Sequence, residues 1–342
     1  MHLHPKLKFV CLRLLQAVPV VFGILVVCFL LTRALPGDPA AYFAGAMADA
    51  ESIEQMREKM GLNQPLPIQF LAYLNDLAHG DLGYSISTGQ PVLTEIATRL
   101  PASLELTLLA MLLSVSIAVP LGILAATHPD SWIDHACRFI VTAGVSLPTF
   151  FTGLALSYLF YYLLGWAPAP MGRLDMMSLP PPAVTNFYVL DALIAGETET
   201  ALAALGQLCL PVITLALFTL APIARMTRAA MLQVLSGDFI RTARAAGLAP
   251  RKILYRYALR NAILPVVTTL GMVFSFALGA NVLVEKVFAW PGIGSFAVEA
   301  LVVSDYAAVQ GFVLAMALLF ITLNLVIDIT YTLIDPRLGL ES

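Results

Sequence analysis

Long uncharged, mainly apolar stretches alternate along the chain with shorter polar segments. Each of six stretches exceeds about 18 residues, the length at which a helix can cross the hydrocarbon core of a bilayer. They are residues 14–32, 106–129, 139–172, 200–224, 261–284 and 306–327. Each is longer than a barrel strand, and backbone groups in lipid must be hydrogen-bonded within the protein. The pattern predicts an all-α membrane protein with six transmembrane helices.

The first stretch resembles the apolar region of a signal peptide, because Lys6, Lys8 and Arg13 precede it or lie at its edge. It is nevertheless long enough to span a membrane, and no small-residue cleavage site follows it immediately. We expect it to be retained as an anchor.

Composition supports a membrane protein, and the charge pattern predicts its orientation. Of 342 residues, 59% are hydrophobic and 12% are charged, whereas soluble domains usually carry about 25% charge. If the N-terminus lies in the cytoplasm, 13 of the 19 Lys and Arg residues fall inside and 14 of the 22 Asp and Glu residues fall outside. Since positive residues favour the cytoplasmic side, both termini are predicted to be cytoplasmic.

Motifs of catalytic chemistry are missing from the sequence. No Gly is followed by Lys, which excludes a Walker A loop, and neither His-Glu-x-x-His nor Gly-x-Ser-x-Gly occurs. The four cysteines lie in or beside the apolar stretches without metal-ligand spacing, so we interpret them as small hydrophobic residues. The sequence therefore predicts no catalytic residue, metal site or cofactor in this chain.

Three carboxylates fall within the apolar stretches or at their ends: Glu105, Glu285 and Asp328. A transporter driven by an ion gradient generally needs ionisable groups at membrane depth. These three lie toward helix ends, where a carboxylate can reach water or a neighbouring backbone. We interpret them as structural, so the energy for uphill transport would come from a partner.

The most informative segment is the basic stretch 236–265. Asp238 is predicted to cap a short helix, whose apolar face is formed by Phe239, Ile240, Ala243 and Ala246. Gly247 can take the left-handed conformation that ends a helix, and Pro250 suits the first turn of the next one. That second helix runs into the fifth span and carries Arg251, Lys252, Arg256 and Arg260. A short helix that protrudes between two spans is suited to docking into a groove of a soluble partner.

This segment resembles the EAA loop of ABC importer permeases, whose core is a Gly followed some sixteen residues later by Ile-x-Pro or Leu-Pro. Here Gly247 precedes the sequence Ile263, Leu264 and Pro265. The loop is most similar to the dipeptide, oligopeptide and nickel branch, D-Y-V-R-T-A-R-A-K-G, and reads D-F-I-R-T-A-R-A-A-G at 238–247. Arg241 replaces the Glu of the general motif, as is usual in this branch. Ala246 replaces the Lys, so no salt bridge to an ATPase is assigned there.

Further blocks of the same family follow in order along nearly the whole chain. They are LPGDP at 35–39, GLNQPLPIQF at 61–70, GDLGYSISTGQPV at 80–92, RLPASLELTLLA at 99–110, VEKVFAWPGIG at 284–294 and NLVIDITYTLIDPRL at 324–338. The resemblance implies a type I ABC importer transmembrane-domain fold, also called MetI-like. It also implies a second homologous permease subunit, two cytoplasmic ATPases that bind ATP and Mg²⁺, and a periplasmic or lipid-anchored solute-binding protein. Membrane lipid is an expected partner and nucleic acid is not.

By this resemblance, the ATPase-coupling residues lie in the cytoplasmic loop 233–262. They are Asp238, Phe239, Arg241, Thr242, Ala243, Arg244, Ala246, Gly247 and Leu248. Polar residues of the spans are candidates for lining the translocation path, although helix packing uses the same residue types. These candidates are Ser146, Thr149, Ser275, Asn281 and Asn324.

The expected division of the chain begins with the N-terminus and first span at 1–32 and an external scoop segment at 33–100. The permease core at 101–335 and a cytoplasmic tail at 336–342 follow. Within the scoop, amphipathic helices are predicted at 49–60 and 67–77; the second has an apolar stripe expected to pack against the fold, formed by Phe70, Leu71, Leu74 and Leu77.

Two further predictions concern the external side of the permease core. Five prolines predict that the external loop 165–199 is irregular. Trp290, followed by a Pro-Gly turn, is interpreted as an anchor at the membrane interface.

The sequence thus predicts a membrane subunit of an ATP-driven importer of small peptides. The same importer class for nickel complexes, glutathione or another small solute remains an alternative. A self-sufficient secondary carrier is a rival from a different class, supported by the three intramembrane carboxylates. A structural or receptor-type membrane protein would leave the cytoplasmic hairpin unexplained.

Overall fold

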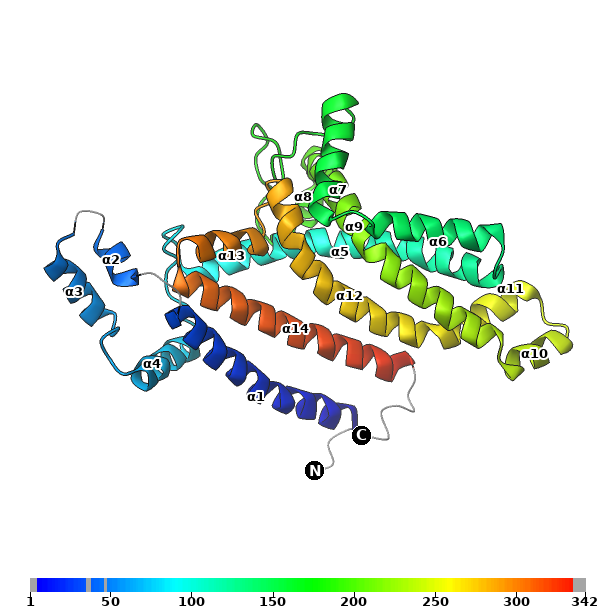
Figure 1. Cartoon of the computed structure of the whole chain (residues 1–342), viewed down its shortest axis with the longest axis horizontal. Helices are drawn as coiled ribbons and strands as arrows, with labels where there is room; N and C mark the ends of the chain where they lie inside the picture. The colour runs from blue at the N-terminus through cyan, green and yellow to red at the C-terminus, as the bar shows by residue number, and fades with distance from the viewer. Residues whose placement is uncertain (1–4, 35–37, 46–47, 335–342) are drawn as a thin grey trace. The chain divides into compact units, whose positions relative to one another are not determined.

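The computed structural model describes residues 5–34, 38–45 and 48–334 (Figure 1). Regular structure in these residues is helical, with a single β-bridge between Tyr84 and Pro91. Part of the sequence-based prediction lies outside the described residues or side chains: the tail 336–342 with Arg337, residues 35–37, and the side chains of Lys6, Lys8 and Arg13.

Among the described residues, four helices are long and apolar enough to cross a membrane. They are α5 (Val92–Thr127), α9 (Thr198–Leu235), the continuous helix Pro250–Val287, and Tyr306–Thr330 within α14 (Tyr306–Ile334). A bent pair of helices raises the number to five. The first helix, α1 (Pro5–Ala34), contains a shorter apolar part, Leu15–Leu31.

The third predicted span is not one straight helix. α6 (Trp132–Val145) is followed by α7 (Thr149–Leu156), which the π-helical segment η1 (Ser157–Leu163) continues. The two parts are bent by 94° relative to each other. Pro148 explains the break, because proline disfavours helical geometry in the residue before it and has no N–H to continue the ladder. The prediction of one helix over 139–172 is wrong in its shape and its end.

The chain divides into two compact units. Unit 1 comprises residues up to Leu100 together with Ile293–Leu325, and unit 2 comprises Pro101–Gly292 together with the residues from Val326 onward.

Unit 1 holds the predicted scoop segment. Its short helices are α2 (Pro39–Ala44), α3 (Ala50–Lys59), α4 (Leu66–Ala78) and α13 (Ile293–Val302). Its apolar core joins the start of α5 to α13 and α14 through Val92, Ile96, Ile293, Phe296, Ala300 and Ala308.

The two helices predicted in the scoop are confirmed. Asp49 accepts a hydrogen bond from the Ser52 N–H at 2.9 Å and so starts α3. On α4, the Phe70 ring lies 5.2 Å from the Phe29 ring, centroid to centroid. Leu71 does not join this packing, because it is 65% exposed. The predicted apolar stripe is therefore wrong at that position.

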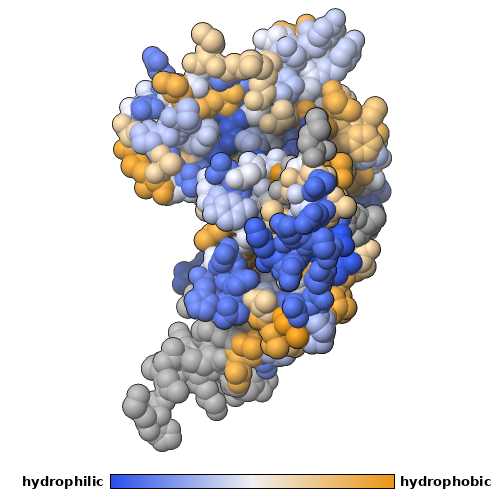
Figure 2. Space-filling model, turned by 90° about the vertical axis from the view of Figure 1, so that its left-hand side faces the viewer, coloured by the Kyte–Doolittle hydropathy of each residue, from blue (hydrophilic) through white to orange (hydrophobic). Residues whose placement is uncertain are grey.

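The exposed side of α3 is hydrophilic. The view onto the side of the molecule where α3 lies has hydrophilic side chains gathered in its middle, with apolar ones at the margins (Figure 2). Exposed polar residues of α3 are Glu51, Ser52, Glu54, Gln55, Glu58 and Lys59.

Unit 2 is built on two long helices that pack together, α9 and α12 (Arg260–Val287). α6, α7 and α8 (Tyr188–Ala195) pack against α9, and the core between them is mainly Leu, Ala, Val, Phe and Trp. Between α9 and α12 lies a hairpin made of α10 (Asp238–Ala245), α11 (Pro250–Lys252) and the π-helical segment η2 (Ile253–Leu259).

Replacing Gly292 with Ala is expected to destabilise unit 2, because a Cβ there would collide with the Glu285 carboxylate and the Ser103 hydroxyl. Overpacking of this kind costs about 1–3 kcal/mol. Thermal unfolding of the purified protein in detergent would measure the loss.

Gly279→Ala is the matched control, since a Cβ at Gly279 on α12 would meet nothing within 4 Å. Alanine should be neutral or slightly stabilising in that helix. Equal midpoints for the two variants would contradict the packing argument.

Candidate functional site

The hairpin between α9 and α12 contains the predicted coupling residues, and its first helix begins one residue earlier than predicted. Gly237 occupies the cap position, so Asp238 is the first helical residue and the prediction that it caps the helix is wrong. The Asp238 carboxylate instead lies 3.1 Å from the Arg241 guanidinium, with both side chains exposed. Such exposed pairs contribute little to stability.

The end of α10 is confirmed at Gly247, whose φ is +71°. The Gly247 N–H donates to the Arg244 carbonyl at 3.0 Å, and the Leu248 N–H donates to the Ala243 carbonyl at 3.3 Å. These two bonds form a Schellman motif, which satisfies the last carbonyls of the helix and needs a left-handed residue at this position. Pro250 then starts the next helix as predicted.

Only half of the predicted apolar face of α10 is buried. Ile240 and Ala243 pack into a core with residues of α5, α9 and η2, whereas Phe239 is 47% exposed and Ala246 is also exposed. The helix therefore rests on the fold through one stripe and offers a second, mixed stripe outward. The other exposed coupling candidates are Arg241, Thr242, Arg244 and Gly247, while Leu248 is half-buried.

A groove of about 700 Å³ lies beside the hairpin. Its walls come from the ends of α5 and α9, the turn after α10, and the start of η2; the lining includes Leu232, Leu235, Arg244, Leu248, Arg251 and Leu254. The surface combines apolar side chains with two guanidinium groups, a combination that can recognise an amphipathic protein surface carrying acidic residues.

A buried ion pair holds the base of this region. The Asp134 carboxylate, which is 0% exposed, accepts hydrogen bonds from two nitrogens of Arg228 at 2.7 and 2.6 Å. The Asp130 N–H also donates to it at 3.2 Å, and Arg138 lies 3.5 Å away. The pair ties the start of α6 to α9 two turns before the hairpin. It was not predicted; the only sequence signal is the i,i+4 spacing of Asp134 and Arg138.

Asn281 is the one path candidate that the structure places in a buried polar cluster. Its Nδ2 lies 3.3 Å from the Ser103 carbonyl and the Thr107 hydroxyl and 3.2 Å from the Glu285 carboxylate. The Ser103 hydroxyl donates to the same carboxylate at 2.5 Å. Glu285 is thus satisfied structurally, as predicted, and Asn281 acts within unit 2 as a connector between α5 and α12.

The other path candidates do not gather with Asn281. The Ser146 hydroxyl donates to the Thr142 carbonyl and the Ser275 hydroxyl to the Gly271 carbonyl, so both bond within their own helical segments. Thr149 is half-buried at the start of α7. Asn324 is exposed on α14 and belongs to unit 1.

Glu105 is also satisfied structurally, through a partner that sequence reasoning missed. The Arg173 guanidinium donates to it at 2.7 Å, and the Val189 N–H donates to it at 2.9 Å. The side chains of Arg173 and Glu105 are only 5% and 3% exposed. The guanidinium also lies 3.5 Å from the centre of the Tyr188 ring, a cation–π contact. The loop 165–199 is thereby fixed to α5.

The loop 165–199 is less irregular than predicted, because it contains the helix α8. Asp191 of α8 holds the turn before the helix: its carboxylate accepts bonds from the N–H groups of Val184, Thr185 and Asn186 and from the Thr185 hydroxyl. Burial raises the pKa of Asp191, but these hydrogen bonds outweigh it and hold the pKa below its ordinary value.

Trp290 is not an anchor at the membrane interface, so that prediction is wrong. Its side chain is 1% exposed, and its Nε1–H donates to the Ala102 carbonyl at 3.0 Å. The loop 165–199 approaches this turn at Gly172, which takes a φ of +97° and whose N–H donates to the Phe288 carbonyl at 3.1 Å.

The chain has the features of a polytopic helical membrane protein with an exposed basic hairpin between two of its spans. In the part of the chain that the structure describes, no group of three His, Cys, Asp or Glu residues could hold a metal ion. The arrangement is suited to contact and transmission of movement between subunits.

Two family matches cover most of the sequence. Residues 118–340 match "Binding-protein-dependent transport system inner membrane component", and residues 6–107 match the N-terminal region of the same kind of component. The chain belongs to this family of transport-system membrane components.

Curated relatives are similar over nearly their full length. The "Probable D,D-dipeptide transport system permease protein DdpB" of Escherichia coli K12 is 46% identical over 320 residues, 94% of each chain. The "Dipeptide transport system permease protein DppB" of Alkalihalophilus pseudofirmus is 40% identical over 97% of this chain and 99% of its own. The "Glutathione transport system permease protein GsiC" of Escherichia coli O6:H1 is 37% identical, with the same shares.

Replacing Phe239 with Ala should weaken attachment of a soluble partner while leaving the fold intact, because this side chain is 47% exposed. Copurification of the ATPase subunits and the thermal midpoint in detergent would separate the two effects. Ile240→Ala, the adjacent control, removes a side chain that is 0% exposed and should cost about 2–5 kcal/mol of stability. Loss of stability in the Phe239 variant would contradict its assignment as a surface residue.

Protonation of Asp191 should release the turn at 184–186. Because the folded-state pKa is lowered, the stabilisation is complete above the ordinary value of roughly 4 and is lost as pH falls through the folded value. At neutral pH, Asp191→Asn should lower amide protection at 184–186 by about tenfold, measured by hydrogen exchange. Asp175→Asn is the control. It should change hydrogen exchange only at Met177 and Ser178, because the Asp175 carboxylate accepts hydrogen bonds from their N–H groups.

Proposed function

We propose that this chain is a permease subunit of an ATP-driven ABC importer that carries small peptides across the inner membrane. The family assignment gives the class of transport component, and the relatives named for dipeptide transport support the peptide substrate. Glutathione and nickel complexes remain alternative cargoes within the same importer class; the relative named for glutathione transport supports the first.

The proposed topology has six spans with both termini in the cytoplasm. Five spans are proposed from the four long helices and the bent pair. We propose α1 as the sixth span, because its 30 residues are long enough to cross a membrane. The basic residues between Arg225 and Arg260 support a cytoplasmic hairpin. In this topology the scoop segment 33–100 and the loop 165–199 lie outside, and the permease core occupies 101–335.

The proposed assembly contains a second homologous permease, two ATPases in the cytoplasm and a solute-binding protein outside, which is either periplasmic or lipid-anchored. ATP and Mg²⁺ would bind to the ATPases. The loop 165–199 is a candidate contact for the binding protein. Deleting residues 175–198 and measuring stimulation of ATP hydrolysis by the binding protein would test that contact.

The observation that carries the proposal is the exposed stripe of α10 on a rigid hairpin. Ile240 and Ala243 anchor the helix, the Schellman motif fixes its end, and Phe239 faces outward. A helix held in this way can transmit movement of an ATPase to α9 and α12, because both flanking spans continue directly from the hairpin. A secondary carrier has no need of such a surface. Purified alone in liposomes, the chain should be inert, whereas a carrier would move solute on an ion gradient.

Gly247→Val should uncouple ATP hydrolysis from uptake while the complex still inserts into the membrane. A branched side chain at a φ of +71° is strained, so the end of α10 would change its direction. Proteoliposomes of the complete importer should retain ATP hydrolysis and lose most peptide uptake.

Gly196→Val is the matched control, since Gly196 has a φ of +76° and open space around it at the end of α8. It should carry a similar strain and leave coupling largely intact. Normal uptake by the Gly247 variant would overturn the coupling role.

A further inference from the structure

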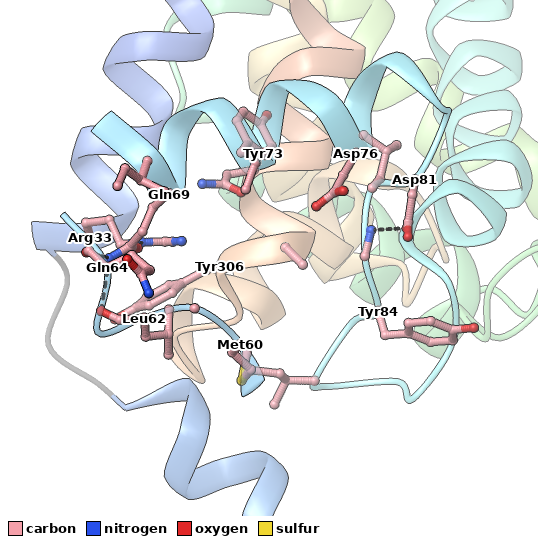
Figure 3. A pocket seen from close by; sticks show the side chains of 18 residues that line it. Arg33, Met60, Leu62, Gln64, Gln69, Tyr73, Asp76, Asp81, Tyr84 and Tyr306 are labelled. Atoms are coloured by element: carbon pink, nitrogen blue, oxygen red, sulfur yellow. Dashed lines mark hydrogen bonds between the residues drawn. The ribbon is translucent and has the colours of Figure 1, made fainter. Parts of the chain in front are cut away.

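Unit 1 contains a cleft of about 300 Å³ between α4, the end of α1, the loop after α4 and the start of α14 (Figure 3). This volume lies at the lower limit of ligand pockets, which favours a ligand of a few residues or fewer. The cleft is separate from the coupling hairpin, which belongs to unit 2.

Charges of opposite sign line this cleft without neutralising each other. Arg33 and Gln69 lie toward one end, and Asp76 and Asp81 lie toward the other (Figure 3). In the described part of the chain, neither Arg33 nor Asp76 has an ion-pair partner. Within the described residues, the Asp81 carboxylate accepts one hydrogen bond, from the Gly83 N–H at 2.8 Å, while its backbone N–H donates to the Asp76 carbonyl.

Arg33 is held in place by neutral groups alone. Its Nε donates to the Gln69 amide oxygen at 3.0 Å, and its guanidinium carbon lies 4.8 Å from the centre of the Phe29 ring and 5.8 Å from that of the Tyr306 ring. Gln69 is fixed in turn by donating to the carbonyls of Leu62 and Gln64. A half-buried guanidinium oriented in this way, with terminal nitrogens left over, is suited to a carboxylate.

The wall that carries the acidic end is also fixed in advance. Asp305 at the start of α14 accepts hydrogen bonds from the Ser85 hydroxyl at 2.7 Å and from the Ser87 N–H at 3.1 Å. The buried Tyr73 hydroxyl, on the cleft side of α4, has no hydrogen-bond partner among the residues that the structure describes. Preorganised walls reduce the entropy cost of binding a small ligand.

We propose that this cleft binds a small zwitterion with a free carboxylate and a free ammonium group at opposite ends, the chemistry of a short peptide. The carboxylate binds at Arg33, and the ammonium group binds at Asp76 and Asp81. The assignment of peptide as the natural ligand rests on the proposed function, in which this segment lies on the outer side and receives solute from the binding protein. The cleft would then be a transient acceptor site.

The test uses the full membrane complex in nanodiscs without the binding protein, and three probes: dialanine, N-acetyl-dialanine and dialanine amide. Saturation-transfer NMR titrations measure their affinities. Dialanine should bind about five- to tenfold more tightly than either derivative, since each derivative loses one charge-assisted contact.

Variants identify the ends of the site. Arg33→Gln should weaken dialanine binding about five- to tenfold and leave the affinity for the amide unchanged, and Arg33→Lys should restore part of the loss. Asp76→Asn should weaken dialanine binding and leave the affinity for the N-acetyl derivative unchanged. Arg57→Gln is the control, because Arg57 in the same unit is paired with Asp38 and Glu54 and does not line the cleft.

Equal binding of all three probes, or equal loss of all three in both variants, would overturn the zwitterion site. Peptide uptake by the complete importer distinguishes this failure from failure of the proposed function. Uptake that persists without terminus-dependent binding removes only the cleft proposal, whereas absence of uptake with every peptide tested removes the proposed function.

Discussion

A charge excluded from water must be matched, and this constraint organises unit 2. Glu105 is matched by Arg173 and Asp134 by Arg228, and Glu285 accepts a hydrogen bond from Ser103. Breaking a buried pair by removing one partner costs about 3–5 kcal/mol, with a smaller effect where a partner reaches solvent. Contacts between apolar helices have little directional preference in lipid. The matched charges therefore set which parts of α6 and α9 lie together, and which parts of α5 meet the loop 165–199 and α12.

Two of these buried carboxylates lie on either side of one apolar stretch. Glu105 comes just before the apolar stretch 106–129, and Asp134 comes shortly after it. One pair fixes the loop 165–199 to α5, and the other fixes α6 to α9 near the hairpin. Paired charges therefore lie on both sides of this mainly apolar span in the sequence.

Much of this structure could be predicted from local chemistry, but the long-range pairs could not. The bounds of α3 and α4, the end of α10 and the left-handed Gly247 follow from caps, helical spacing and glycine, which act within a few residues. The ion pairs join residues 68 and 94 positions apart, and no local pattern specifies such partners. The 94° bend had a visible signal in Pro148, but its angle depends on what each part packs against. The π-helical segments had no sequence signal that we could use.

The errors on side-chain exposure have a common physical origin. A sequence shows that an aromatic residue lies near a span end, but not whether it faces the membrane interface or is covered by protein. Trp290 is covered, and the Ala102 carbonyl accepts a hydrogen bond from its N–H. Phe239 and Leu71 are the opposite case, apolar residues on short helices that cover the fold with one stripe only. Periodicity identifies the apolar positions of a helix, but the width of the contact depends on its neighbours.

The hairpin depends on both kinds of interaction. Its turn is fixed by residues close together in the sequence, whereas its packing depends on distant helices. Gly247 and Pro250 fix the turn within four residues, independently of the rest of the chain. Ile240 depends on a core that also includes parts of α5, α9 and η2. η2 carries the chain from the turn into α12, and π-helical segments are often found at functional sites. The hairpin is therefore continuous with α9 through the preceding turn and with α12 through η2. In the proposed coupling role, one contact on α10 would act on both spans together.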